Sequence, residues 1–145
     1  MNQQRKLEKV LAFYQQQLEL IKTRFKAQAK LVAAKEIQAK QLRRQLRDTQ
    51  ERSAAAEPTV CTLEMTASLL EQIEISSRQN QHQLTEATRR LEIRRLELRT
   101  HMSKIEALEK VVANKTKTIE HLKRQTEQHL ADERYLNTHF NGSIK

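Results

Sequence analysis

The chain has 145 residues with one glycine, one proline and five aromatic residues, which are too few turn-forming residues for a sheet protein or a compact enzyme. With 37% hydrophobic and 31% charged residues, the composition fits a narrow buried seam better than a globular core. We therefore expect one all-helical unit over residues 1–145, with no enclosed pocket, no cofactor and no enzyme activity.

The formal net charge of +9 is distributed unevenly along the sequence. Between residues 20 and 47, nine residues are basic and Glu36 is the only acidic one. Residues 53–77, by contrast, contain four glutamates and no basic residue. The nine are Lys22, Arg24, Lys26, Lys30, Lys35, Lys40, Arg43, Arg44 and Arg47. Such a stretch attracts nucleic acid, an acidic membrane surface or an acidic protein groove, and it is equally compatible with a solvated helix face.

The first predicted helix spans about residues 3–52. Asn2 is suited to capping its N-terminus, and no helix breaker occurs from Gln3 to Arg52. Twelve positions follow alternating steps of four and three residues, the spacing of a coiled-coil seam, and ten of them are apolar. These positions are Leu7, Leu11, Tyr14, Leu18, Ile21, Phe25, Gln28, Val32, Lys35, Ala39, Leu42 and Leu46.

A break is predicted at about residues 53–58, because Pro58 pushes the preceding residue out of helical geometry. Residues 59–76 form either a short separate helix at the tip or a continuation into the next helix. The first alternative is favoured by the polar stretch 76–83 and by the capping-box spacing of Ser68 and Glu71. A long helix then extends to about Asn141, where Asn141-Gly142 is a suitable stop.

The heptad spacing resumes after the proline. Its positions are Leu63, Leu70, Ile73, Ser77, Asn80, Leu84, Ala87, Leu91, Arg94, Leu98, His101, Ile105, Leu108, Val112, Lys115, Ile119, Leu122, Leu136 and Phe140. They include an unbroken apolar series between residues 84 and 119. Its members are Leu84, Leu91, Leu98, Ile105, Val112 and Ile119. Polar residues interrupt the two seams at Gln28, Lys35, Arg94, His101 and Lys115. These residues either select the register of pairing or are tolerated imperfections.

Because one linker joins the two halves, the expected fold is all-α, a long antiparallel two-helix coiled-coil hairpin. If the turn lies at residues 54–58, Leu11 faces roughly Ile105, and the last ~30 residues have no intramolecular partner at this register. If residues 59–80 are all tip, the two long helices match in length. The sequence does not decide whether the seam closes within one chain or between two.

Other kinds of chemistry have little support in this sequence. His129 and Glu133 lie one turn apart without a third ligand, so no metal site is expected. The single cysteine, Cys61, and the short apolar run Val10–Tyr14 indicate a soluble protein of a reducing compartment with no membrane insertion. Basic residues are spread through both helices without an aromatic platform, so weak nucleic-acid binding is an alternative and specific recognition is not expected.

Three stretches carry a family resemblance. They are Leu7–Leu18, Leu69–Leu84, and Leu108-Glu-Lys with the closing Glu127–Glu133. In this order they resemble the flagellar export protein FliJ and its counterparts in virulence type III secretion, a family of small basic coiled-coil stalk proteins. One departure is His129, where a lysine is usual, which leaves the choice between a flagellar and a virulence system open.

The resemblance implies an antiparallel coiled coil inserted in the central hole of a hexameric export ATPase, promoting its assembly or activity. It also implies a link to the cytoplasmic domain of the export gate, with Leu69 and Ile73 at the gate contact. The location would be cytoplasmic, peripheral to the secretion apparatus at the inner membrane, and export chaperones are possible further partners. A structural or adaptor coiled coil of another complex is the alternative function.

In the expected hairpin, the aromatic residues gather toward the end that carries both termini, where the ATPase would bind. Basic side chains there, including Lys6 and Lys9, would suit acidic surfaces inside the ring. The candidate ATPase contacts are Leu7, Leu11, Tyr14, Arg134, Leu136 and Phe140.

Overall fold

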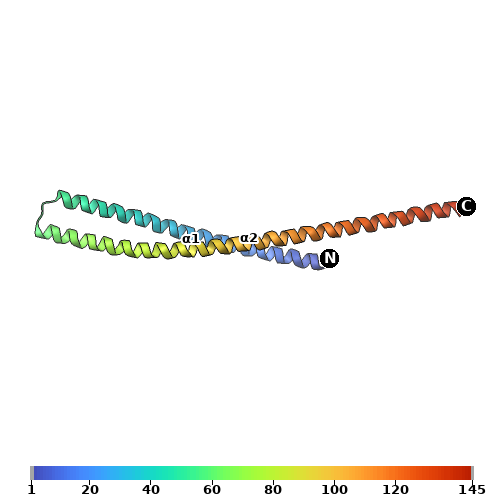
Figure 1. Cartoon of the computed structure of the whole chain (residues 1–145), viewed down its shortest axis with the longest axis horizontal. Helices are drawn as coiled ribbons and strands as arrows, with labels where there is room; N and C mark the ends of the chain where they lie inside the picture. Colours follow the sequence, from blue (N-terminus) through green and yellow to red (C-terminus); the bar gives the residue numbers. More distant parts are fainter. Residues whose placement is uncertain (1, 145) are drawn as a thin grey trace. The chain divides into compact units, whose positions relative to one another are not determined.

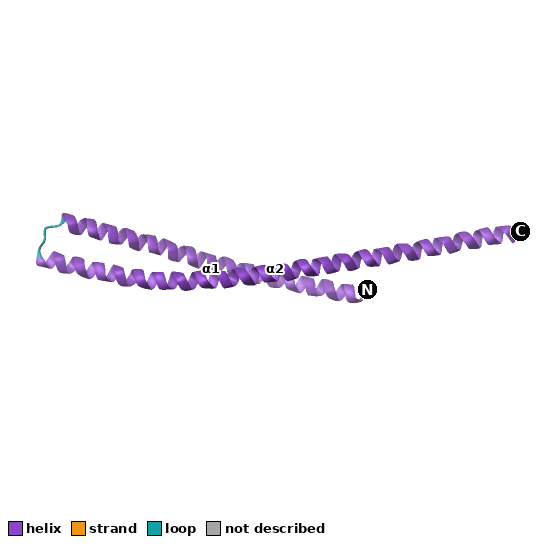
Figure 2. Ribbon diagram, viewed as in Figure 1, coloured by secondary structure: helices purple, strands orange, loops and turns teal. Residues whose placement is uncertain are grey.

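The computed structural model describes residues 2–144, and it describes the side-chain surroundings of residues 2–139. Two helices account for nearly all of this chain: α1 spans Asn2–Ala55 and α2 spans Val60–Ile144 (Figure 1). Residues 56–59 form the loop between them, and no strand occurs within residues 2–144 (Figure 2). The all-helical prediction is confirmed, and the two helices are compatible with a helical hairpin.

The loop begins slightly later than the sequence predicts, because α1 continues to Ala55. Thr59 then caps α2: its hydroxyl accepts a hydrogen bond from the Thr62 amide at 3.2 Å, and its carbonyl accepts one from the Leu63 amide at 3.0 Å. In return, the Thr62 hydroxyl accepts from the Thr59 amide at 3.0 Å. This reciprocal pair satisfies amide groups that the first turn of a helix leaves without partners, so α2 starts at Val60, two residues after Pro58.

The second break and the terminal stop are not observed. α2 is continuous through Ser68 and the polar stretch 76–83, because that stretch contains no glycine or proline and its Asn80 is buried against α1. There is therefore no separate tip helix. The helix also continues past Asn141-Gly142 to Ile144, since one glycine costs a helix only about 1 kcal/mol relative to alanine.

The chain divides into two compact units, and both helices contribute to each. Unit 1 combines the chain up to Gln17 with the chain from His101, and unit 2 is Leu18–Thr100. In unit 1, the Gln4 amide donates to the Thr116 hydroxyl at 2.9 Å, and His101 Nε2 lies 2.7 Å from the Tyr14 carbonyl oxygen. A carbonyl only accepts, so the His101 ring is the donor.

In unit 2, polar side chains also reach the facing helix. Gln28 Nε2 donates to the Ala87 carbonyl at 3.0 Å, and Asn80 Nδ2 donates to the Lys35 carbonyl at 3.2 Å. Lys35 Nζ donates to Gln83 Oε1 at 2.7 Å. As residue numbers rise along this part of α1, the numbers of their partners on α2 fall.

Burial follows the expected seams closely. On α1 every seam position from Leu7 to Leu42 is buried or half-buried, and on α2 the same holds from Leu70 to Ile119. The buried residues are Val32, Ile73, Asn80, Ala87 and Ile105. Seam positions outside these ranges are exposed, namely Leu46, Leu63, Leu122 and Leu136. The Phe140 side chain lies outside the part of the chain that the structure describes.

Asn80 is 3% exposed, and we expect its loss to destabilise the fold. Asn80→Ala removes one interhelical hydrogen bond and part of a packed side chain, so it should lower the free energy of unfolding by about 1 kcal/mol. Gln79→Ala, next to it on the exposed face, should stay within about 0.5 kcal/mol of the parent. Urea titrations followed by far-UV circular dichroism measure both values. Equal effects of the two substitutions would contradict the proposed role of Asn80.

Candidate partner-binding surfaces

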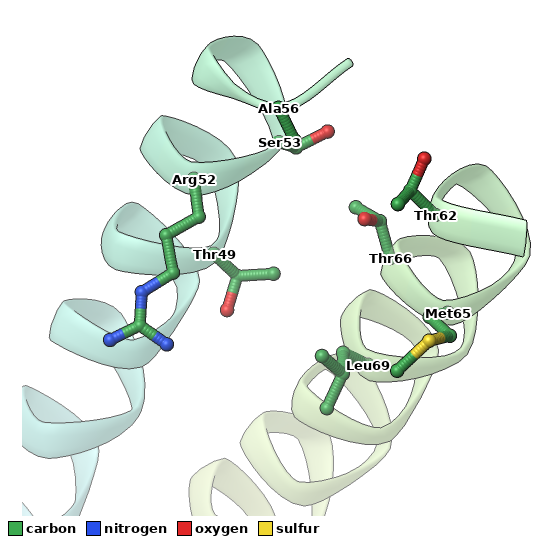
Figure 3. A pocket seen from close by; sticks show the side chains of 8 residues that line it. All are labelled: Thr49, Arg52, Ser53, Ala56, Thr62, Met65, Thr66 and Leu69. Atoms are coloured by element: carbon green, nitrogen blue, oxygen red, sulfur yellow. The ribbon is translucent and has the colours of Figure 1, made fainter. Parts of the chain in front are cut away.

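An open cavity of about 210 Å³ lies between α1 and α2 next to the loop, within unit 2 (Figure 3). Met65 and Leu69 extend from α2 toward the opening, and Thr49 faces them from α1 (Figure 3). The lining residues are Thr49, Arg52, Ser53, Ala56, Thr62, Met65, Thr66 and Leu69. The lining thus combines apolar side chains with hydroxyl-bearing side chains and Arg52.

A second open cavity of about 370 Å³ adjoins the first and shares three of its residues, Thr49, Arg52 and Leu69. Its lining is Leu42, Gln45, Thr49, Arg52, Leu69, Gln72, Ile73 and Ser76. Because of the shared residues, we treat the two cavities as one feature, the loop-end groove, defined by the residues that line either cavity.

Small and polar residues at seam positions explain why the groove is open. Heptad spacing continued beyond Leu46 places Thr49 and Ser53 on the α1 side, and the same spacing before Leu70 places Thr66 on the α2 side. These side chains are too short to fill the space between two helices that leucines fill elsewhere. Sequence reasoning did not identify these residues, although the heptad spacing contained the signal.

Two of the apolar side chains that line the groove are exposed. Met65 is 62% exposed and Leu69 49%, although both are large apolar residues. Exposed large apolar side chains beside an open cavity are typical of protein interaction sites. The loop end of unit 2 is therefore a candidate partner-binding surface.

Both predicted gate residues, Leu69 and Ile73, line this groove, but the exposed fractions of their side chains differ. Leu69 lines both cavities and is 49% exposed. Ile73 lines only the second cavity and is buried. A partner that binds in the groove would therefore contact Leu69 directly, while Ile73 contributes mainly to helix packing. Their role at an export gate stays a prediction.

The candidate ATPase contacts in unit 1 form two groups. Leu7, Leu11 and Tyr14 are half-buried seam residues of α1, and the Tyr14 ring centroid lies 5.3 Å from that of His101. Arg134 and Leu136 belong to the other group, in a part of α2 where residues 120–139 are all exposed. The seam burial of α2 ends at Ile119, so the described side chains beyond it lack cover.

The expected gathering of aromatic residues is not seen among the described contacts. Phe13 packs edge-on against Tyr14, with ring centroids 6.0 Å apart. Tyr135 instead stacks on His139, one turn further along its own helix, at a centroid distance of 6.0 Å. The two aromatic pairs therefore belong to separate surfaces.

Further chemistry is sparse among the described residues. Glu133 Oε1 lies 3.3 Å from His129 Nε2, and both side chains are exposed. Within the searched residues 2–144, no group of three metal-ligating side chains occurs, and neither helix has a stretch long and apolar enough to cross a membrane. Cys61 is a free, exposed cysteine.

Comparison with protein-family models, curated proteins and solved structures finds no match to this chain. Function is therefore inferred from the residues and contacts described above. Two surfaces stand out: the loop-end groove of unit 2 and the exposed part of α2 in unit 1.

The different exposure of Leu69 and Ile73 gives a stability prediction. Ile73→Ala removes buried side-chain volume and should lower the free energy of unfolding by about 2 kcal/mol or more. Leu69→Ala removes a half-exposed side chain and should cost less than about 1 kcal/mol. Chemical denaturation measures both. If the two substitutions destabilise equally, Leu69 is a core residue and the groove is not an accessible surface.

Proposed function

We propose that this protein is a stalk of a type III export apparatus, located in the cytoplasm next to the inner membrane. It would insert into a hexameric export ATPase, promote its assembly or activity, and link it to the export gate. The observation that carries the proposal is the exposed part of α2 in unit 1. There Leu122, Leu130 and Leu136 are 48 to 63% exposed on a helix without described cover.

The proposal includes an antiparallel coiled coil formed by α1 and α2. In its support, seam burial follows heptad spacing on both helices, and hydrogen-bond partners run in opposite order within each unit. The unbroken helix from Val60 onward also fits a stalk, because a long continuous helix transmits position and force better than a jointed one.

The ATPase contact is assigned to unit 1. Leu136 and the neighbouring Arg134 are exposed and would enter the ring as an apolar and a cationic contact. Leu7, Leu11 and Tyr14 are half-buried in the seam, so their contribution would be to hold α2 in place as well as to touch the ring. Phe140 remains a proposed contact whose side chain the structure does not describe.

The gate contact is assigned to the loop-end groove of unit 2. Leu69 is the proposed anchor because it is half-exposed and lines both cavities. Ile73 is buried, so it would hold this part of α2 in place by packing between the helices. The family resemblance implies both residues at the gate contact, and the burial of Ile73 leaves Leu69 as the residue proposed to touch the gate.

The direct test is the ATP hydrolysis rate of the cognate type III export ATPase, titrated with this protein at fixed moderate salt. The proposal predicts a saturable stimulation at about one chain per hexamer, because a single stalk occupies the axis of a symmetric ring. No stimulation together with no detectable binding would remove the stalk proposal and leave a general adaptor coiled coil.

Two variants serve as controls for each other. Leu69→Ala should retain the stimulation and lose binding to the cytoplasmic domain of the gate, because the groove is remote in sequence from the ATPase contacts. Arg134→Glu combined with Leu136→Ala should lose the stimulation and retain gate binding. Loss of both activities in both variants would argue against separate contact surfaces.

A further inference from the structure

A straight row of cations lies along α1 in unit 2. Seven positions from Lys26 to Arg47 follow alternating steps of four and three residues, and five of them are basic. We call these five the basic row: Lys26, Lys30, Lys40, Arg44 and Arg47. Ala33 and Ile37 occupy the two remaining positions. All seven residues are exposed, and at 1.5 Å per residue the row is about 32 Å long.

The basic row faces away from α2. Lys26 and Lys30 lie two positions from Gln28, whose side chain bonds to α2. Lys40 and Arg44 lie two positions from Leu42, a half-buried seam residue. Two residues correspond to about 200° of rotation around a helix, so the row occupies the opposite side of α1. Packing between the helices therefore leaves this surface open.

The row also lacks acidic partners. On α2, Arg78, Arg89 and Arg95 each form an ion pair with a glutamate three or four residues away, at 2.6 to 3.4 Å. No ion pair within residues 2–139 includes a member of the row. Glu36 is the single carboxylate between residues 20 and 47. The positive charge of α2 in unit 2 is thus largely compensated by nearby glutamates, and that of the row is not.

We propose that the basic row is a docking surface for an anionic membrane surface. A flat layer of acidic headgroups lets every side chain of a straight row approach a negative charge at once, without any matching groove. Ile37 is 57% exposed within the row and adds an apolar contact at the headgroup level. The protein would lie on the membrane through α1 without inserting into it.

Nucleic acid fits the same surface less well. α1 and α2 together are about 20 Å wide, whereas the major groove of a DNA duplex is about 12 Å wide and admits one helix. Single strands are usually held by stacking on aromatic side chains. Phe25 is the single aromatic residue between positions 18 and 100, and it is half-buried in the seam.

Vesicle co-sedimentation of the full chain at about 0.1 M salt tests the proposal. The protein should bind vesicles containing phosphatidylglycerol and should not bind vesicles of phosphatidylcholine alone. A triple variant with Lys30→Gln, Lys40→Gln and Arg44→Gln should bind on the order of 100-fold more weakly, from the loss of three cations near the surface. Circular dichroism of the variant should still give a helical spectrum, because these side chains are exposed.

The matched control removes the same number of positive charges from α2, with Arg78→Gln, Arg89→Gln and Arg95→Gln. Its binding should fall by less than about tenfold, because these side chains are already ion-paired.

Equal losses in the two variants would overturn the proposal, since net charge alone would then explain binding. Binding to neutral vesicles would overturn it as well. Displacement from the vesicles by duplex DNA at equal phosphate concentration would replace it with nucleic-acid binding. These outcomes do not depend on the export ATPase.

Discussion

The rest of the structure depends on an apolar seam between the two helices. Some seam positions carry polar side chains, and these form hydrogen bonds to the backbone of the facing helix. In unit 2, Gln28 and Lys35 are seven residues apart, and so are their partners Ala87 and Asn80. One offset between the helices therefore satisfies both hydrogen bonds, and a shift by one residue would break both. Apolar burial holds the helices together, but the heptad spacing repeats every seven residues and so allows a shift by a whole heptad. Polar contacts of this kind favour one of these registers over the others.

Heptad spacing was enough to predict two helices, the position of the break to within a few residues, and most of the buried positions. It failed where local and tertiary effects compete. The polar stretch 76–83 suggested a break, yet it is helical because Asn80 finds a partner on α1. The loop-end groove was missed because Thr49 and Thr66 were never weighed as seam positions. Leu69 was chosen by family resemblance, and its partial exposure agrees with its position next to Leu70, outside the heptad seam.

The surface has areas that differ in charge and in exposed apolar side chains, and these areas are suited to different partners. The arginines of α2 in unit 2 are largely paired with nearby glutamates, which makes that surface electrostatically neutral at short range. The outer face of α1 keeps its positive charge, and the loop-end groove keeps its exposed apolar side chains. The proposed stalk role uses the groove and the exposed part of α2, and it leaves the outer face of α1 free.

Disulfide trapping in a Cys61→Ser background tests the pairing of the helices most directly. Cysteines introduced by Gln28→Cys and Ala87→Cys should form an intrachain disulfide rapidly under mild oxidation, because the native side chain at one position bonds to the backbone of the other. Pairs shifted by one heptad, Gln28→Cys with Asn80→Cys or with Arg94→Cys, should react slowly. Equal rates for a shifted pair, or disulfides mainly between chains, would contradict the account.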